Sequence, residues 1–197
     1  MQNLQQRILK CTNCPLHETR KNSIVGEGNL NAEILLVGEA PGADEDRVGR
    51  PFIGKSGQLL DKILEACGFT RETHIFISNI VRCRPPGNRV PTRTEVQTCL
   101  PYLLEQIELI NPQIIITLGA TSLKKLLGDE SYKISRVRGN WIDWNGRSLM
   151  PVYHPAALLR NPNLKRETWA DFQKVIFKYR QLVDPNHFSK HLQKDSI

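Results

Sequence analysis

The sequence predicts an α/β protein, a three-layer α/β/α sandwich around a central, mainly parallel four-stranded sheet. Apolar runs alternate along the chain with segments whose apolar residues recur at helical spacing. The runs are almost wholly apolar, which is typical of strands buried on both faces of a parallel sheet. With 197 residues, 40% of them hydrophobic, the chain can bury one full core. We therefore expect a single domain over residues 1–183 and a polar C-terminal tail over 184–197.

The expected elements follow in order. The apolar runs predict strands at 33–37, 74–81, 113–118 and 149–153. Helical spacing predicts helices at 57–69, 94–110, 123–127 and 168–183. We expect Thr94 to cap the second helix, and Pro101 to kink it or shift its start.

Three of these strands end in unusual loops. A Gly- and Pro-rich segment, GEAPG, follows the first strand at 38–42, Asn79 lies at the end of the second, and His154-Pro155 follows the fourth. Ligands of parallel sheets lie beyond the carboxyl ends of the strands. The three loops therefore predict one active site.

The charge pattern indicates a polyanionic partner. The formal net charge is +7, and basic residues gather on expected loops at 82–93, 136–138 and 160–166. No apolar stretch is long enough to cross a bilayer. Residues 1–10 lack an apolar signal segment, so we expect a cytoplasmic protein.

Four cysteines form a pattern that is typical of an iron–sulfur cluster. Cys11 and Cys14 make a C-x2-C pair, and fifteen residues separate Cys83 from Cys99. Structural zinc usually takes two compact pairs, whereas a cubane cluster accepts thiolates from scattered loops. Disulfide bonds, which a reducing compartment disfavours, and four unrelated core residues are the alternatives. Cys67 lies on the apolar face of a predicted helix and is left out of the ligand set.

Four further motifs occur together with these cysteines, GEAPG at 38–42, GRPFIGKSG at 49–57, SNIVRCRPPGN at 78–88 and HPAALLR at 154–160. In this joint order they resemble the iron–sulfur uracil-DNA glycosylases, often called family 4, over residues 11–180. The resemblance implies a base excision repair enzyme that flips uracil out of DNA and hydrolyses its N-glycosidic bond, leaving an abasic site. It also implies a structural 4Fe–4S cluster held by the four cysteines. The expected partner is uracil-containing DNA, with no membrane, no nucleotide cofactor and a monomeric, nucleoid-associated enzyme.

The resemblance also implies a uracil pocket. Phe52 matches the aromatic residue that stacks on the base. Asn79 matches the residue that hydrogen-bonds uracil N3 and O4, and His154 matches the residue that donates to uracil O2. Plainer interpretations are a core phenylalanine, a strand-end cap and a structural histidine. The resemblance implies Glu39, Asn79 and His154 as the catalytic residues. Further contacts to uracil and the attacking water are expected from the first loop, at Gly38, Glu39 and Ala40.

DNA contacts are expected around this pocket. Lys55 and Ser56 resemble a phosphate-binding turn at a helix N-terminus. Leu158 or Leu159 is expected to enter the gap that the flipped base leaves. Further contacts to DNA are expected from Asn88 and Arg160.

Three other functions are compatible with parts of the sequence. Residues 49–56 fit G-x4-GKS, but no strand precedes them, which argues against nucleotide binding. A binding module that holds uracil-DNA without efficient turnover and an electron-transfer protein remain as alternatives. No lysine falls at a base-contact position in the motifs, which favours a monofunctional glycosylase without a lyase step.

Overall fold

The computed structural model describes residues 1–191 and contains a six-stranded sheet in the order β1-β3-β2-β4-β6-β5. Its parallel centre consists of β2 (Ile34–Gly38), β3 (Ile75–Asn79), β4 (Ile114–Leu118) and β6 (Arg147–Val152). Two short antiparallel strands form the edges, β1 (Glu27–Gly28) and β5 (Ile142–Trp144). The predicted α/β class is confirmed. The predicted number of four strands is wrong, because the edge strands are too short to show as apolar runs.

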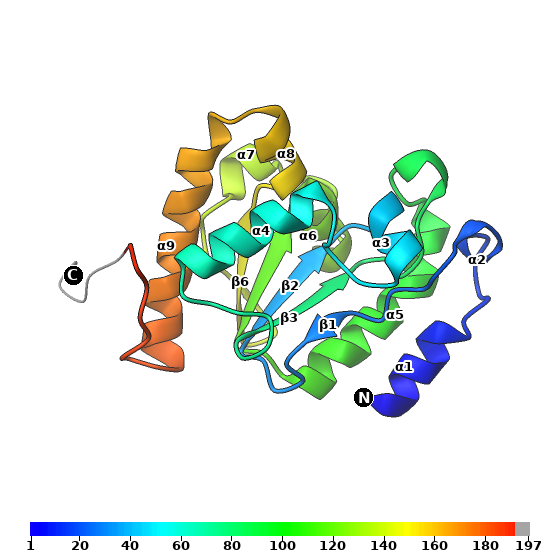
Figure 1. Ribbon diagram of the computed structural model, residues 1–197, viewed down its shortest axis with the longest axis horizontal. Coiled ribbons are helices and arrows are strands. Elements are labelled where there is room, and N and C mark those ends of the chain that lie inside the picture. The colour runs from blue at the N-terminus through cyan, green and yellow to red at the C-terminus, as the bar shows by residue number, and fades with distance from the viewer. Residues whose placement is uncertain (192–197) are drawn as a thin grey trace.

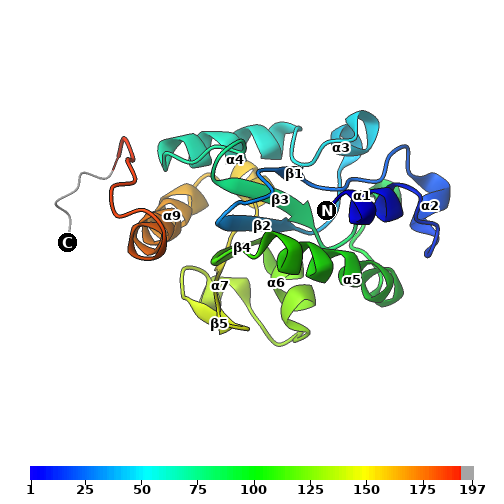
Figure 2. The same ribbon diagram turned by 90° about the horizontal axis from the view of Figure 1, so that it is seen from below.

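Helices cover both faces of the sheet (Figures 1 and 2). Leu36 and Ile116 of the strands pack with α4 (Lys55–Ala66) and α9 (Leu164–Leu182) on one face. Leu35 and Ile115, their neighbours in sequence, pack with α5 (Arg93–Ile110) and α6 (Ala120–Leu127) on the other. Since successive strand residues point to opposite faces, a strand between two helical layers must be apolar throughout.

Shorter helices complete the chain. The sequence analysis did not predict α1 (Gln2–Leu9), α2 (Leu16–Thr19), α3 (Ala43–Val48), η1 (Pro86–Asn88), α7 (Ile134–Val137) and α8 (Pro155–Arg160). Helix α1 packs against α5, which brings the N-terminal segment beside the loop that follows β3 (Figure 1). The sequence predicts no strand directly before residue 49, and the structure has helix α3 there.

The start of α5 differs from the prediction. Thr92, not Thr94, is the cap: its hydroxyl accepts a hydrogen bond from the Glu95 amide, and the Glu95 carboxylate accepts one from the Thr92 amide. Arg89 also donates to Glu95 and so reinforces this capping box. Pro101 does not shift the start of the helix, which runs continuously through it.

The described part of the predicted tail packs onto the domain. The His187 ring stacks on Phe69 with centroids 4.5 Å apart, and its Nε2 hydrogen-bonds the Cys67 carbonyl at 2.9 Å. The Ser189 hydroxyl donates to the Ala66 carbonyl at the end of α4. Residues 192–197 of the predicted tail lie outside the described residues. Across 1–191, the helices are too short or too polar to span a bilayer.

Candidate active site

A cleft of about 740 Å³ opens at the carboxyl ends of the parallel strands. Its lining includes residues at or just beyond the ends of β2, β3 and β6, namely Glu39, Asn79 and His154. Phe52, from the loop between α3 and α4, completes this group. The sheet thus brings together the side chains that the sequence analysis placed in one pocket.

Asn79 presents a polar group with no protein partner. Its side chain is 2% exposed, and its Oδ1 atom has no hydrogen-bond partner among the described residues. A Cβ atom at Gly38 would lie 2.3 Å from this oxygen and 2.7 Å from the Phe52 ring, so only glycine fits there. Since a buried acceptor without a partner costs about 1–3 kcal/mol, the site is built to accept a hydrogen bond from a ligand.

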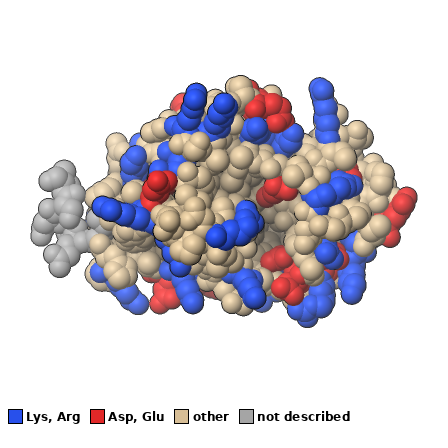
Figure 3. Space-filling model, turned by 90° about the horizontal axis from the view of Figure 1, so that it is seen from above, with Lys and Arg blue, Asp and Glu red and all other residues tan. Residues whose placement is uncertain are grey.

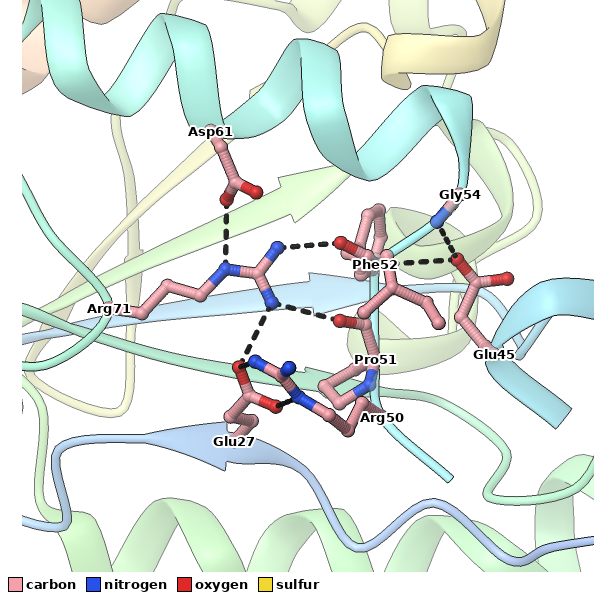
Figure 4. Close-up of polar contacts among 9 residues, drawn as sticks. Glu27, Glu45, Arg50, Pro51, Phe52, Gly54, Asp61 and Arg71 are labelled. Carbon is pink, nitrogen blue, oxygen red and sulfur yellow. Dashed lines mark hydrogen bonds and ion pairs between the residues drawn. The ribbon is translucent and has the colours of Figure 1, made fainter. Parts of the chain in front are cut away.

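Phe52 stands beside His154, with ring centroids 5.7 Å apart and planes inclined by 34°. The backbone of Phe52 is in the left-handed region, with φ at 51°, which is uncommon for an aromatic residue. Glu45 lies next to this segment, and its carboxylate accepts hydrogen bonds from the amides of Ile53 and Gly54 (Figure 4). The ring therefore has a fixed place in the wall of the cleft.

His154 is neutral at physiological pH. Burial, and secondly the charge of Arg160, lowers its pKa to about 4. Its Nδ1 atom accepts a hydrogen bond from the Ala156 amide at 3.1 Å, as the N-cap of α8. Because Nδ1 is the acceptor, the proton of the neutral ring is on Nε2, which is left as a donor.

The rim of the cleft carries the expected DNA-contact residues. Lys55 and Ser56 open α4 after its N-cap Gly54, and Arg160 ends α8. Figure 3 shows Lys and Arg side chains projecting around this end of the molecule, with acidic groups among them. Asn88 also lines the cleft, and its Oδ1 accepts a hydrogen bond from Arg84.

The two leucines of α8 differ sharply in exposure. Leu158 is 1% exposed and lies in the interior, whereas Leu159 is 46% exposed. Neither lines the cleft itself. Only Leu159 is free to contact a ligand.

The sequence analysis missed several residues of the cleft. They include Tyr153, directly before His154, and Ala120 and Thr121, which begin α6 just beyond β4. The rule that ligands lie at the carboxyl ends of strands predicts residues after β4 as well, but no unusual loop drew attention to them. Ile134 comes from α7, which had no signal in the sequence.

The four cysteines of the predicted ligand set line one small cavity between α1, α2 and α5. None of the five cysteines, all within the described residues, forms a disulfide bond. Within residues 1–191, no three or more His, Cys, Asp or Glu side chains are grouped so as to hold one metal ion. Cys67 lies apart in the core, as expected, and burial raises its pKa to about 12.

The surroundings of these thiols suit an anionic group. Arg20 donates to Cys83 Sγ at 3.0 Å, and the Arg82 amide donates to Cys99 Sγ at 3.3 Å. The Arg82 side chain is fully buried, donates to Ser78 and Gln106 but to no carboxylate, and its Nε atom has no partner in the described chain. A buried cation requires a counter-charge, so the donor set fits a thiolate-ligated cluster.

Comparison with known proteins agrees with this geometry. Residues 25–173 match the family described as the uracil DNA glycosylase superfamily. A type-4 uracil-DNA glycosylase from Thermotoga maritima is 48% identical, over 89% of this chain and 92% of that protein. Type-4 enzymes from Pyrobaculum aerophilum and Saccharolobus solfataricus are each 46% identical, covering 89% and 87% of this chain and 91% and 83% of their own lengths. The chain therefore belongs to the uracil DNA glycosylase superfamily.

Proposed function

We propose that the protein is a monofunctional uracil-DNA glycosylase, which extrudes uracil from DNA and hydrolyses its N-glycosidic bond. The observation that carries this proposal is the buried, unpartnered Oδ1 atom of Asn79, beside Phe52 and His154 in one cleft. The type-4 relatives support the same activity, since they resemble this chain over most of their length.

Asn79 supplies the discrimination between bases. Uracil presents a donor at N3 and an acceptor at O4, and a carboxamide matches both. Cytosine presents the reverse pattern at the same edge, so it leaves the buried Asn79 oxygen without a partner. That mismatch costs about 1–3 kcal/mol in a dry site, which corresponds to roughly 5- to 150-fold.

His154 stabilises the departing base. When the glycosidic bond breaks, its electron pair goes to uracil N1, and negative charge spreads to O2. A neutral imidazole that donates from Nε2 stabilises this charge without losing its proton. Water then adds its hydroxyl to the sugar carbon and gives up a proton to solvent.

The remaining walls hold the substrate in place. Phe52 offers its ring as a stacking surface for the base, and Gly38 leaves room for this ring and the Asn79 side chain, which a Cβ atom would overlap. Glu39 and Ala40 line the cleft where the attacking water must lie. Lys55 lies at the exposed rim, where it suits a phosphate contact better than a Schiff base with the sugar.

DNA contacts come from the rim. We assign phosphate contacts to the first turn of α4, with Lys55 and Ser56, and to the end of α8, with Arg160, because all three residues line the cleft. Leu159 is the residue we assign to the gap in the base stack, because Leu158 is buried.

A 4Fe–4S cluster would be held by Cys11, Cys14, Cys83 and Cys99. With every iron bound by cysteine, such a cluster would offer no open coordination site, and its role would be to fix the N-terminal segment and the loop after β3. Replacing Cys99 with Ala is expected to remove the brown colour and the iron and sulfide found by chemical analysis. A colourless wild-type protein, purified without oxygen and free of iron, would refute this assignment.

The activity is tested with a uracil-containing oligonucleotide. Incubation followed by alkali is expected to cleave the strand at uracil, and omission of alkali is expected to leave it intact. The Asn79→Ala variant is the matched control. Absence of alkali-dependent cleavage by the wild-type protein refutes the proposed function, and cleavage without alkali refutes the monofunctional mechanism.

A further inference from the structure

The backbone at Phe52 is strained. Its φ of 51° lies in the left-handed region, which a non-glycine residue adopts only when its surroundings impose it. A relaxed backbone would carry the phenyl ring away from the cleft. Some part of the structure must therefore hold this residue, and the contacts behind it identify which part.

Arg71 holds the carbonyl side of this segment (Figure 4). It lies in the loop before β3, and its Nη2 atom donates to the Phe52 carbonyl at 2.6 Å. Its Nη1 atom donates to the Pro51 carbonyl at 2.9 Å. The guanidinium thus binds two consecutive backbone oxygens, a geometry that its planar fork permits and a lysine ammonium does not.

Arg71 is itself fixed. Its Nε atom donates to Asp61 of α4 at 2.8 Å, and Nη1 also contacts Glu27 of β1 at 3.3 Å. The side chain is only 11% exposed. A guanidinium with two carboxylates and two carbonyls around it has few other positions open to it, so it is a rigid support.

The other side of the segment is held as well. Glu45 accepts hydrogen bonds from the amides of Ile53 and Gly54, each at 3.0 Å. Gly57 in the first turn of α4 approaches so closely that a Cβ atom there would lie 1.8 Å from the Phe52 oxygen. The backbone on both sides of Phe52 is therefore fixed, and Arg71 is the only support that binds Phe52 itself through a side chain in the described residues.

We propose that Arg71 is a positioning residue for uracil recognition, which holds the Phe52 ring against the base by binding the carbonyls of Pro51 and Phe52. Arg71 does not line the cleft, so it acts through Phe52 and not by touching the substrate. The inference rests on the proposed function and extends it from Phe52, in the wall of the pocket, to Arg71, which holds Phe52 in place.

The first experiment compares Arg71→Met with Arg147→Met. Arg147 is a matched control: its side chain is 13% exposed and pairs with Glu108, and it begins β6 at the end of the sheet away from the cleft. Single-turnover excision from a single-stranded uracil oligonucleotide is expected to fall at least about tenfold in Arg71→Met, since two hydrogen bonds from a charged donor are lost. Arg147→Met is expected to stay within about twofold of the wild type at equal folded fraction.

Binding of uracil-free DNA separates positioning from a DNA contact. Its affinity is expected to be unchanged in Arg71→Met, while inhibition by free uracil weakens in parallel with the excision rate. Equal losses of both affinities would overturn the proposal. If Arg71→Met does not fold, Arg71→Lys takes its place, because it keeps the charge and one donor and should show a smaller loss of the same kind.

A double-mutant cycle with Phe52→Ala gives the decisive result. If Arg71 acts through the phenyl ring, Arg71→Met costs less than about twofold once the ring is gone. An unchanged cost in the Phe52→Ala background, with an active wild-type enzyme, overturns the inference alone. A wild-type protein that releases no uracil overturns the proposed function, and this inference with it.

Discussion

His154 is predicted to remain neutral well into the acid range. Its ring lies partly buried in the cleft wall. The pKa of His154 is lowered from the ordinary 6.5 to about 4, by burial first and by Arg160 next, with Glu45 opposing. The test lowers the pH of the protein solution from 7 to 5. Over this range an ordinary histidine becomes charged, whereas His154 should keep its single proton on Nε2.

The size of the effect follows from the two pKa values. Between pH 6.5 and 4 the unfolded chain binds a proton that the folded protein does not, so stability is lost as pH falls through this window. With a folded-state pKa of about 4, the loss between pH 7 and pH 5 is about 2 kcal/mol. Above pH 6.5 His154 contributes no further pH dependence.

The assay is NMR of ¹⁵N-labelled histidine. His154 is assigned by comparison with His154→Asn, whose side-chain oxygen can still accept from the Ala156 amide as an N-cap. We expect a titration midpoint near pH 4 and nitrogen shifts of the Nε2–H tautomer above it. The stability difference between pH 7 and 5 should be about 2 kcal/mol smaller in the variant. A midpoint at pH 6 or above would show that the cleft does not lower the pKa of His154, and the Nδ1–H tautomer would rule out Nε2 as the donor.

Three further predictions follow from the cleft. Asn79→Ala should lower uracil excision by about 10- to 100-fold without lowering the melting temperature, because the buried Oδ1 atom has no partner to lose; a lower melting temperature contradicts this. Leu159→Ala should reduce activity on double-stranded more than on single-stranded DNA at unchanged stability, while Leu158→Ala should cost about 2–5 kcal/mol in denaturant unfolding; the opposite pattern refutes the assignment of the wedge. Arg160→Ala should lower the slope of log affinity against log salt by about one, measured by fluorescence anisotropy, and an unchanged slope excludes its phosphate contact.

The central strands could be predicted because a strand buried on both faces requires consecutive apolar residues, which are visible in the sequence. Leu35 and Leu36 face opposite helical layers, and both must be apolar. The edge strands carry no such constraint: β1 has two half-buried residues, and β5 alternates with an exposed Asp143. Their pairing depends on neighbours far away in sequence, which local patterns do not report.

The residues of the cleft floor could also be predicted from the strand pattern. The residues that hold Phe52 in place, Arg71 above all, could not. Asn79 is the last residue of β3 and His154 lies two residues after β6, so the topology of a parallel sheet brings them together. Arg71 lies on a loop and binds carbonyls about 20 residues earlier in the chain, together with Glu27 and Asp61. No spacing in the sequence connects these residues. Only the fold shows that they act on Phe52.

The floor of the cleft is buried and uncharged, whereas its rim is exposed and charged. Base recognition by the floor and DNA binding by the rim can therefore be tested separately. Asn79 is almost fully buried and uncharged, and Phe52 beside it is 6% exposed, so their contacts depend on shape and hydrogen bonding and respond weakly to salt. Lys55 and Arg160 are exposed charges, whose contacts release counterions and weaken steeply as salt rises. Substitutions in the floor should therefore change which base is removed. Substitutions in the rim should change the affinity for DNA of any sequence. Arg71 itself is charged but largely buried. The Arg71→Met variant belongs with the floor variants if it alters base recognition by the same factor at every salt concentration.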